Sequence, residues 1–594
     1  MSDAKKRRIQ TSKDPEVWQK WFNELPSEFE NSSDENDYDD EGDDYEDEDA
    51  VEESNHDTDS ELEVSEDDEL LDEEENSSSS HLSGYYIGKD KITKWRKNPP
   101  NLQVRLRSHN IVKHLPGTKG NARNATTPIE CLKLFINEII VRIITISTNI
   151  YIDNIQNRFQ RVRDARKTDE REMSAFIGIL FLIGTFRSSR KNLKKIWDNS
   201  RGSGIESCYL AMSENRFRFL LRCVRFDNVE TRNERRELDK LAPIRELFEN
   251  FLVNFQANFI PSEFLTVDEQ LLAFRGRCGF KQFIPSKPAK YGIKMFALVD
   301  AKTSYTMNLE TYVGLQPEGP YKLNNSGEEI VLRLVQPIAG TNRNVTGDNW
   351  FSSVPLVEKL LRHHKLTYIG TLRKNKREIP PEFLPHKKTE EKSSIFGFKE
   401  ECTLVSYCPK KNKSVLLLSS MHHCKTIDVD TGVDKKPIII TDYNRTKIGV
   451  DLVDQLCNNY NVARNTRRWP MVVFYDLLNI SGINALCVFK ANHPRQTVSR
   501  SEFLEKCAWE LIKPQIEVRS TILQLPVEIR RRARHLLGVS EVLPAPPNRP
   551  QNYVGRCLIC PRSDNKSTRK YCYKCNRYTC KNHMKEICVT CMAE

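Results

Sequence analysis

The sequence predicts a mixed α/β domain between two helical regions, followed by a small cysteine-rich unit. Three apolar, strand-like segments occur in a row at 264–268, 292–299 and 304–313, and helical and strand patterns then alternate. Residues before 262 and after 458 instead carry apolar side chains at helical spacing. Seven of the 17 cysteines lie in the last 38 residues. The chain of 594 residues is long enough for several domains.

The N-terminal part of the chain is strongly acidic. Residues 28–75 hold 28 Asp and Glu and neither Lys nor Arg. Such a segment buries too little apolar surface to offset its chain entropy, so we expect residues 1–116 to be disordered. Because 28 of the 82 acidic residues lie there, the rest of the chain carries 91 basic side chains against 54 acidic ones. A body that basic favours a polyanionic partner, usually nucleic acid, over a charge that serves solubility alone.

The cysteines and the N-terminus indicate the cellular compartment. Ten cysteines are scattered singly and the first residues contain no apolar stretch, which favours a reducing compartment. The most apolar run, 175–186, is well short of the ~20 residues of a membrane span, so we expect no membrane association. The basic cluster Lys5-Lys6-Arg7-Arg8 is typical of nuclear import signals, and we expect a nuclear protein.

Helical structure is predicted to begin at Thr127. Thr127 suits the N-cap, Pro128 the first helical position and Glu130 the third, which together form a capping box. Further helices are predicted at 169–186, 212–225 and 243–258. Their apolar stripes are most simply the core of a helical region.

The residues after 263 predict a sheet with helices. A helix near 326–338 follows the three strands, and the segment RNVTGDNWFSSVPLVEKLLRHHKLTYIGTL then predicts strand, loop, helix and strand. Residues 374–435 are rich in Lys and turn residues, which predicts an irregular insertion. KPIIITDYN, residues 436–444, predicts one more strand of the sheet. Helices are predicted at 446–460 and 470–492.

Four aspartates are placed where they can form one acidic site. Asp268 and Asp348 each end an apolar strand, and Asp451 and Asp454 are three residues apart on one face of a predicted helix. Carboxylates at one rim of a sheet are hard oxygen ligands that suit Mg²⁺ or Mn²⁺. Two such ions ~4 Å apart can activate a water or a 3′-hydroxyl and stabilise the leaving oxygen. Ordinary solvated strand ends are the alternative that spacing alone leaves open.

Basic and polar side chains follow these aspartates in the sequence. Arg275 and Arg277 come soon after Asp268, and we expect them to hold the phosphates of a nucleic acid beside the ions. Further candidates for nucleic acid contacts are Lys290, Asn349, Arg373 and Lys376. For the basic cluster that begins at Arg373, a solvated turn is the alternative.

The C-terminal cysteines form regular pairs with two-residue spacers. Their order is Cys557-x2-Cys560, Cys572-x2-Cys575, Cys580-x2-His583 and Cys588-x2-Cys591. Eight soft ligands suffice for two tetrahedral Zn²⁺ sites, which must supply much of the folding free energy of so short a segment. We expect interleaved, cross-brace sites, although sequential pairing is an alternative. One ion would take Cys557, Cys560, Cys580 and His583, and the other Cys572, Cys575, Cys588 and Cys591.

Five segments resemble the hallmark segments of piggyBac-family DNA transposases. In the family's order they are LTVDEQLLAFRGRCGFKQFIPSKPAKYGIK, GDNWFSS, IGTLRKNKREIP, YNRTKIGVDLVDQLC and RRWP. The cysteine-rich end matches as well, so the resemblance covers roughly residues 115–594. It implies that Asp268, Asp348 and Asp451 are the catalytic aspartates and that Asp454 is a further important one.

The resemblance also implies the fold and its domains. The family has an RNase H-like catalytic core interrupted by an insertion domain, and flanking helices that jointly form a dimerisation and DNA-binding domain. The expected boundaries are 1–116 for the acidic region, 117–262 and 458–540 for the split helical domain, 263–372 and 436–457 for the core, 373–435 for the insertion, 541–555 for a linker and 556–594 for the zinc-binding domain.

The implied activity is cut-and-paste transposition of double-stranded DNA. The family cleaves at terminal inverted repeats through hairpin ends and inserts at TTAA sites, so we expect two Mg²⁺ or Mn²⁺ ions per active site, two structural Zn²⁺ ions and a homodimer. Intact aspartates favour an active enzyme over a domesticated, transposase-derived DNA-binding protein without catalysis. A ubiquitin ligase with a cross-brace zinc domain is a further alternative, but it leaves the aspartates unexplained.

Overall fold

The computed structural model describes residues 84–100, 107–200, 202, 204–285, 287–386, 389–539, 554–572 and 577–584, together with the backbone of 51–53. Most of the acidic segment and the basic cluster Lys5-Lys6-Arg7-Arg8 lie outside these residues, as do Cys575, Cys588 and Cys591.

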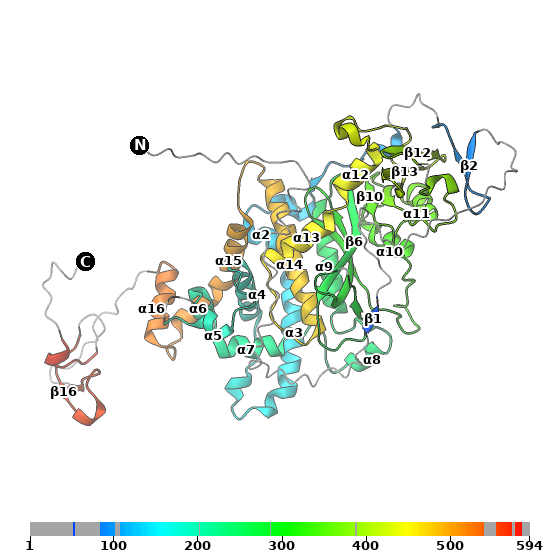
Figure 1. The fold of residues 1–594 in the computed structure, drawn as a ribbon. Helices are drawn as coiled ribbons and strands as arrows, with labels where there is room; N and C mark the ends of the chain where they lie inside the picture. The colour runs from blue at the N-terminus through cyan, green and yellow to red at the C-terminus, as the bar shows by residue number, and fades with distance from the viewer. Residues whose placement is uncertain are drawn as a thin grey trace, which may run out of the picture. The chain divides into compact units, whose positions relative to one another are not determined.

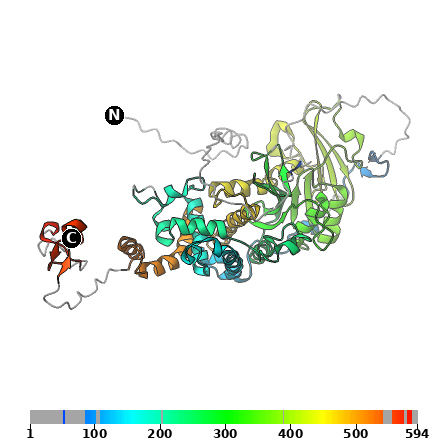
Figure 2. The ribbon, with the colours of Figure 1, turned by 90° about the horizontal axis from the view of Figure 1, so that it is seen from below.

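Helices precede and follow the sheet in the sequence, and the two groups pack against one another. The first group contains the capping box predicted at Thr127, whose hydroxyl accepts from the Glu130 amide while the Glu130 side chain accepts from the Thr127 amide. An added Cβ at Gly178 of the first group would lie 2.9 Å from the Cβ of Leu511 in the second. Figures 1 and 2 show this association of α4 with α15. The first group consists of α2 (Pro128–Lys133), α3 (Glu138–Ile155), α4 (Glu170–Thr185), α5 (Leu193–Trp197), α6 (Glu206–Ala211), α7 (Glu214–Cys223), α8 (Arg232–Arg236) and α9 (Arg245–Asn258), and the second of α14 (Trp469–Asn492), α15 (Arg500–Thr521) and α16 (Val527–Leu536).

The central sheet is mixed. Five of its strands lie in the spatial order β9-β8-β6-β10-β11, which is 3-2-1-4-5 in chain order. β6, β10 and β11 are parallel, and β8 runs antiparallel to both β6 and β9. Two short strands, β7 and β1, continue the sheet beyond β8. The strands are β1 (Val51–Glu53), β6 (Phe264–Ala273), β7 (Lys281–Phe283), β8 (Tyr291–Asp300), β9 (Thr306–Thr311), β10 (Asn344–Gly347) and β11 (Thr367–Thr371), with α10 (Gly327–Leu334) and α11 (Val354–Lys359) between them in sequence.

The insertion is regular, contrary to the irregular segment predicted for 374–435. It contains an antiparallel meander of β12 (Ser393–Phe398), β13 (Thr403–Lys410) and β14 (Lys413–Ser419), and β14 pairs with β11, so the meander extends the central sheet. The first six residues of β13 are all buried. The Lys-rich turns between these short strands gave the sequence its loop-like composition, while the strands themselves are covered on both faces.

Residues 436–444 were predicted to be a strand, and this prediction is wrong. They belong mainly to helix α12 (Ile438–Thr446), which begins after Pro437. Ile439, Ile440 and Tyr443 fall on one helical face and pack on the meander with Val405 and Leu417. A run of three isoleucines favours a strand by local propensity, but here tertiary packing of a helical face outweighs it.

Part of the N-terminal region that we expected to be disordered is folded. Residues 84–100 contain a β-hairpin of β2 (Tyr85–Ile87) and β3 (Lys94–Arg96), and β3 pairs with β12 at Arg96 and Phe398. Trp95 is fully buried. The composition of the acidic segment does not extend to these residues, and one large aromatic side chain anchors the short hairpin.

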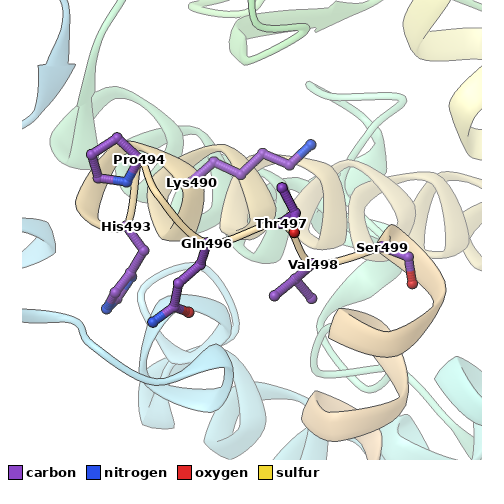
Figure 3. Close-up of a pocket in the computed structure, with 7 residues that line it drawn as sticks. All are labelled: Lys490, His493, Pro494, Gln496, Thr497, Val498 and Ser499. Atoms are coloured by element: carbon purple, nitrogen blue, oxygen red, sulfur yellow. The ribbon is translucent and has the colours of Figure 1, made fainter.

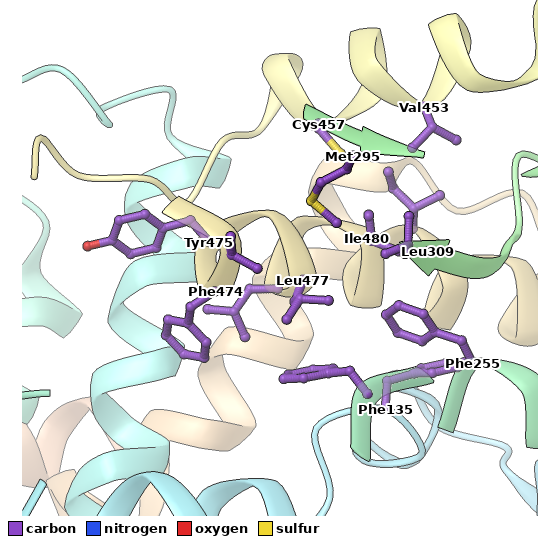
Figure 4. Close-up of a cluster of buried hydrophobic side chains, with 14 of the residues drawn as sticks. Phe135, Phe255, Met295, Leu309, Val453, Cys457, Phe474, Tyr475, Leu477 and Ile480 are labelled. Carbon is purple, nitrogen blue, oxygen red and sulfur yellow. The ribbon is translucent and has the colours of Figure 1, made fainter. Parts of the chain in front are cut away.

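Helix α14 lies at the centre of the hydrophobic core. It is long and apolar enough to cross a membrane, but 89% of its most apolar window is buried inside the protein, as expected for a core helix. Figure 4 shows its residues Leu477 and Ile480 close to Met295 of β8 and Leu309 of β9. The helix therefore joins the helical region to the sheet. Helix α13 (Gly449–Asn459) packs beside it on β6.

Candidate active site

Strand register places Asp268 and Asp348 side by side. Val267 of β6 pairs with Gly347 at the end of the parallel strand β10, and each of these residues is followed directly by an aspartate. Neighbouring strands are about 4.8 Å apart, so the two carboxylates leave adjacent backbones at the rim where β10 ends. Asp348 follows the end of β10 as predicted, but Asp268 does not end its strand, because β6 continues to Ala273 through its pairing with β8. Both are only partly exposed.

Helix α13 brings a third carboxylate to this rim. Gly449, in its first turn, lies against β6 so closely that an added Cβ would be 2.5 Å from the Thr266 hydroxyl. That hydroxyl donates to the carbonyl of Thr446 at 2.5 Å, which fixes the chain just before the helix. Asp451, two residues after Gly449, is thereby held near Asp268.

The electrostatics show that these carboxylates interact. Burial, followed by the charges of Asp348 and Asp451, raises the pKa of Asp268 well above its usual range. Burial also raises the pKa of Asp454 to about 7; Lys287 opposes this shift and Asp451 adds to it. Asp268, Asp348 and Asp454 are half-buried and Asp451 is exposed. Like charges gathered in one place favour a cation between them. The predicted convergence of the aspartates is therefore present.

The donor set fits a hard divalent cation. All the groups are carboxylates, and one buried oxygen of Asp454 has no hydrogen-bond partner among the described residues. A divalent cation bound here would offset the repulsion between the carboxylates.

Lys287, three residues before Lys290, supplies a positive charge at the site. The Lys287 ammonium donates to the carbonyl of Glu269 at 3.3 Å. Its pKa is raised by Asp268 and other site carboxylates, although burial opposes the shift. Lys290 instead lies exposed on the same turn, with φ of 56°. Sequence spacing could not distinguish two lysines three residues apart on an irregular turn.

The predicted basic contacts divide into two groups. Arg373 lies near the site, since its Nε donates to the Asn349 side-chain oxygen at 3.1 Å, and Asn349 follows Asp348. Arg275 and Arg277 are exposed on the connection between β6 and β7. Lys376 lies on the loop that begins at Arg373 and lines a surface pocket there.

A further buried acid was missed. Asp476 lies in the middle of α14, and the side-chain amide of Gln270 donates to it at 3.4 Å. Burial, followed by the charge of Asp454, raises its pKa well above the usual range. The signal was available, because an aspartate that is the one charged residue in the mainly apolar stretch 470–489 is costly to bury.

Asp476→Asn is expected to stabilise the protein in a pH-dependent way. Because the folded pKa is raised, Asp476 is neutral in both states below the unfolded value of ~3.9, and stability is lost as pH rises above it. The free energy of unfolding in urea should be higher for the variant than for wild type, and this difference should grow by ~1 kcal/mol or more between pH 4 and pH 8. The exposed Glu505→Gln is the control, and a difference that stays constant with pH would contradict this account.

One surface pocket lies apart from these residues in sequence. The turn between α14 and α15 forms it, and none of the predicted site residues lines it (Figure 3). Its lining residues are Lys490, His493, Pro494, Gln496, Thr497, Val498 and Ser499.

The cysteine-rich unit forms a second candidate site. Its short strands β15 (Gly555–Arg556) and β16 (Ser567–Thr568) pair with each other. The ligand atoms of Cys557, Cys560, Cys580 and His583 all lie within 4.8 Å of one another. The sulfurs of Cys560 and Cys580 are 3.6 Å apart, close to the ~3.8 Å expected for two thiolates on one tetrahedral zinc.

This grouping agrees with interleaved pairing for the first ion. Under sequential pairing, Cys557 and Cys560 would instead meet Cys572 and Cys575. Hydrogen bonds from backbone amides, that of Cys580 above all, lower the pKa of Cys557 to about 5 and favour the thiolate that binds metal. Of the second predicted set, only Cys572 lies within the described residues.

Known proteins resemble the part of the chain that carries the helices and the sheet. Residues 127–486 match the family model described as transposase IS4. The chain is 24% identical over 373 residues to human PiggyBac transposable element-derived protein 3, which covers 59% of this chain and 60% of that protein. It is 22% identical over 409 residues to human PiggyBac transposable element-derived protein 5, covering 65% of this chain and 76% of the relative. The chain thus spans about 60% of the length of the first of these relatives.

A solved structure extends this similarity. The fold resembles a chain of the piggyBac transposase synaptic complex with hairpin DNA, with a TM-score of 0.70 and 33% identity. The match covers 80% of this chain and 100% of that one. With a family match over more than half of its length and this solved homologue, the chain belongs to the transposase IS4 family, of the piggyBac type.

Proposed function

We propose that this protein is a DNA transposase of the cut-and-paste kind, and that Asp268, Asp348 and Asp451 form its catalytic site. The observation that carries the proposal is the meeting of these three carboxylates, from two parallel strands and one helix, in a chain of this family. The strand order 3-2-1-4-5 supports an RNase H-like core over 263–372 and 436–457. The insertion over 373–435 and the split helices over 117–262 and 458–540 complete the proposed organisation.

The three carboxylates would hold Mg²⁺ or Mn²⁺, with Asp454 beside them. Two such ions would supply an activated water or 3′-hydroxyl and the positive charge that stabilises the leaving oxygen. Lys287 adds a fixed positive charge at the same rim, where it offsets part of the carboxylate repulsion. Arg373 and Asn349 form a hydrogen-bonded pair beside Asp348, and the guanidinium is suited to a DNA phosphate.

The proposed reaction opens transposon ends through hairpins and joins them to TTAA target DNA. The solved homologue is described as a synaptic complex with hairpin DNA, which supports this sequence of steps and double-stranded DNA as the partner. A homodimer would hold two transposon ends together, and a nuclear location would give access to chromosomal DNA. Arg275, Arg277, Lys290 and Lys376 are proposed to contact DNA phosphates around the site.

The cysteine-rich unit is proposed to bind two zinc ions and the transposon ends. The cluster of Cys557, Cys560, Cys580 and His583 supports the first ion. Arg562, Lys566 and Arg569 lie between the paired ligands and suit phosphate contacts.

A donor plasmid experiment tests the proposal. Cells that carry the element's own ends on a plasmid should yield precise excision products, and new insertion junctions should begin with TTAA. The names of the human relatives say only that they derive from such elements, so loss of activity is the alternative. Binding of the ends by the wild-type protein without any excision would favour a domesticated DNA-binding protein.

A further inference from the structure

The N-terminal hairpin, residues 84–97, has a well-defined turn. Both carboxylate oxygens of Asp90 are used: Oδ1 accepts from the amides of Ile92 and Thr93 at 3.0 and 2.9 Å, and Oδ2 accepts from the Thr93 hydroxyl at 2.6 Å. The Gly88 amide donates to the Thr93 carbonyl at 2.8 Å. These bonds make the hairpin a preformed element with little freedom to adapt.

The hairpin holds the backbone of the basic loop, residues 373–379. The amides of Lys89 and Asp90 donate to the carbonyls of Ile379 and Arg377 at 3.2 and 2.9 Å. The Trp95 indole donates to the carbonyl of Glu378 at 2.9 Å. All these acceptors are main-chain carbonyls. The hairpin therefore fixes the path of the loop without using the loop's guanidinium groups.

The other side of the hairpin is anchored in the insertion. Trp95 is fully buried, and Gly397 of β12 lies so close that an added Cβ would be 2.9 Å from the Trp95 Cβ. Tyr86 packs edge-on against Phe383, with ring centroids 5.2 Å apart. The hairpin thus connects the insertion to the basic loop.

The basic loop in turn leads to the carboxylate site. It follows β11 directly, and its first residue, Arg373, donates to Asn349 beside Asp348. One terminal nitrogen of Arg373 is buried and has no hydrogen-bond partner among the described residues. The loop also lines an open surface pocket with Asp90 of the hairpin, to which Arg373, Lys376 and Arg377 contribute. Arg377 is exposed, and Arg373 and Lys376 are half-buried.

We propose that the hairpin is a positioning element for DNA binding by the basic loop. Its residues touch neither the carboxylates nor the DNA in this scheme. They hold the loop so that its guanidinium groups meet phosphates at a fixed distance from the catalytic rim. This inference rests on the proposed function for its DNA partner. Residues that precede the proposed catalytic core in the sequence would then be required for joining to target DNA, and much less for cleaving the transposon ends.

Two glycines of the hairpin provide a matched test in the full-length protein. A Cβ at Gly88 would lie 2.8 Å from the Glu378 carbonyl and 2.8 Å from Asp90, whereas a Cβ at Gly84 would have no neighbour within 4 Å. Gly88→Ala should therefore displace the loop, and Gly84→Ala should not. Trp95→Phe is the second variant, since it keeps an aromatic ring and removes the indole donor.

The readouts separate positioning from folding. With Mg²⁺ and pre-cut ends, Gly88→Ala is expected to raise the KM for a TTAA duplex about tenfold and to leave kcat and end cleavage within about twofold. Hydrogen exchange of residues 373–379 should increase in Gly88→Ala and Trp95→Phe and stay unchanged in Gly84→Ala. Because the displaced loop includes Arg373, the loss of target binding in the double variant Arg373→Ala/Gly88→Ala should be smaller than the sum of the two single losses.

Three outcomes would overturn the inference. The first is that Gly88→Ala leaves both the KM for target DNA and the hydrogen exchange of the loop unchanged. The second is that Gly88→Ala reduces end cleavage as much as joining. The third is that the losses of target binding in Gly88→Ala and Arg373→Ala add fully in the double variant. Absence of end cleavage in the wild type would instead contradict the proposed function. In that case, hydrogen exchange in the loop and the affinity of a plain duplex for the basic loop still decide whether the hairpin positions it.

Discussion

Asp268→Asn is expected to abolish DNA strand cleavage, by ~10³-fold or more, without loss of stability. The substitution removes a central ligand of the proposed cations and keeps the size of the side chain. Since Asp348 and Asp451 both raise the pKa of Asp268, removing this carboxylate also relieves repulsion in the folded protein. The free energy of unfolding at neutral pH should therefore stay equal to that of wild type or increase. Cleavage of an end-labelled duplex with Mg²⁺ and thermal unfolding measure the two effects.

Glu310→Gln is the matched control for this substitution. Glu310 also lies on a strand of the sheet, but it forms an ion pair with Arg333 at 2.6 Å instead of facing the aspartates. Its replacement should leave cleavage within about twofold of wild type, as for a partly exposed ion pair of small net value. If Asp268→Asn cleaves as well as Glu310→Gln, the three-carboxylate site is not catalytic.

The position of the aspartates was predictable because two simple rules act together. A buried strand shows as an apolar run, and residues at the same level of two adjacent parallel strands are neighbours, so Asp268 and Asp348 had to be close if their strands paired in this register, although β6 continues past Asp268 to Ala273. The sequence could not show that pairing, which depends on the Val267 and Gly347 register. Nor could it show the docking of α13, which requires the absence of a side chain at Gly449.

The wrong predictions from the sequence have one physical origin. Each of these segments is determined by tertiary packing, which the local sequence pattern does not show. The isoleucine run at 438–440 has strand propensity, but it forms a helix because one face of that helix packs against the meander. The hairpin at 84–97 is stabilised by Trp95, whose pocket is built from β12 and the basic loop. Lys287 faces the carboxylates because of the course of a turn, and composition says nothing of that.

Asp476 is a buried site residue that its sequence context alone could have indicated. Burying an ionisable group in a mainly apolar core helix is unfavourable in free energy, so a hydrogen-bond partner is expected for it. The partner is Gln270, two residues after Asp268 on the same face of β6. The acidic site thus extends into the core through side chains that alternate along one strand.

Loss of zinc is expected to unfold the cysteine-rich unit while the rest of the protein remains folded. The buried apolar cluster described in residues 554–584 consists of Cys557, Cys560 and Cys580, which are ligands themselves. Without metal, little apolar burial remains to offset chain entropy, whereas structural zinc contributes ~10–16 kcal/mol in small domains. Cys560→Ser in the full chain should therefore lose at least one bound zinc, measured by mass spectrometry, and should lose protection from hydrogen exchange throughout residues 554–584.

The same variant separates end recognition from catalysis. If the cysteine-rich unit binds transposon ends, Cys560→Ser should reduce their affinity by ~100-fold or more, because specific binding falls toward the non-specific level, while the thermal unfolding of the catalytic region stays unchanged. Cys424→Ser is the control, because Cys424 is exposed and lies outside the cluster. Full zinc content and unchanged exchange in Cys560→Ser would contradict the metal site. If Cys560→Ser loses zinc but binds the transposon ends as well as wild type does, the metal site is supported and end recognition is assigned to the helical region.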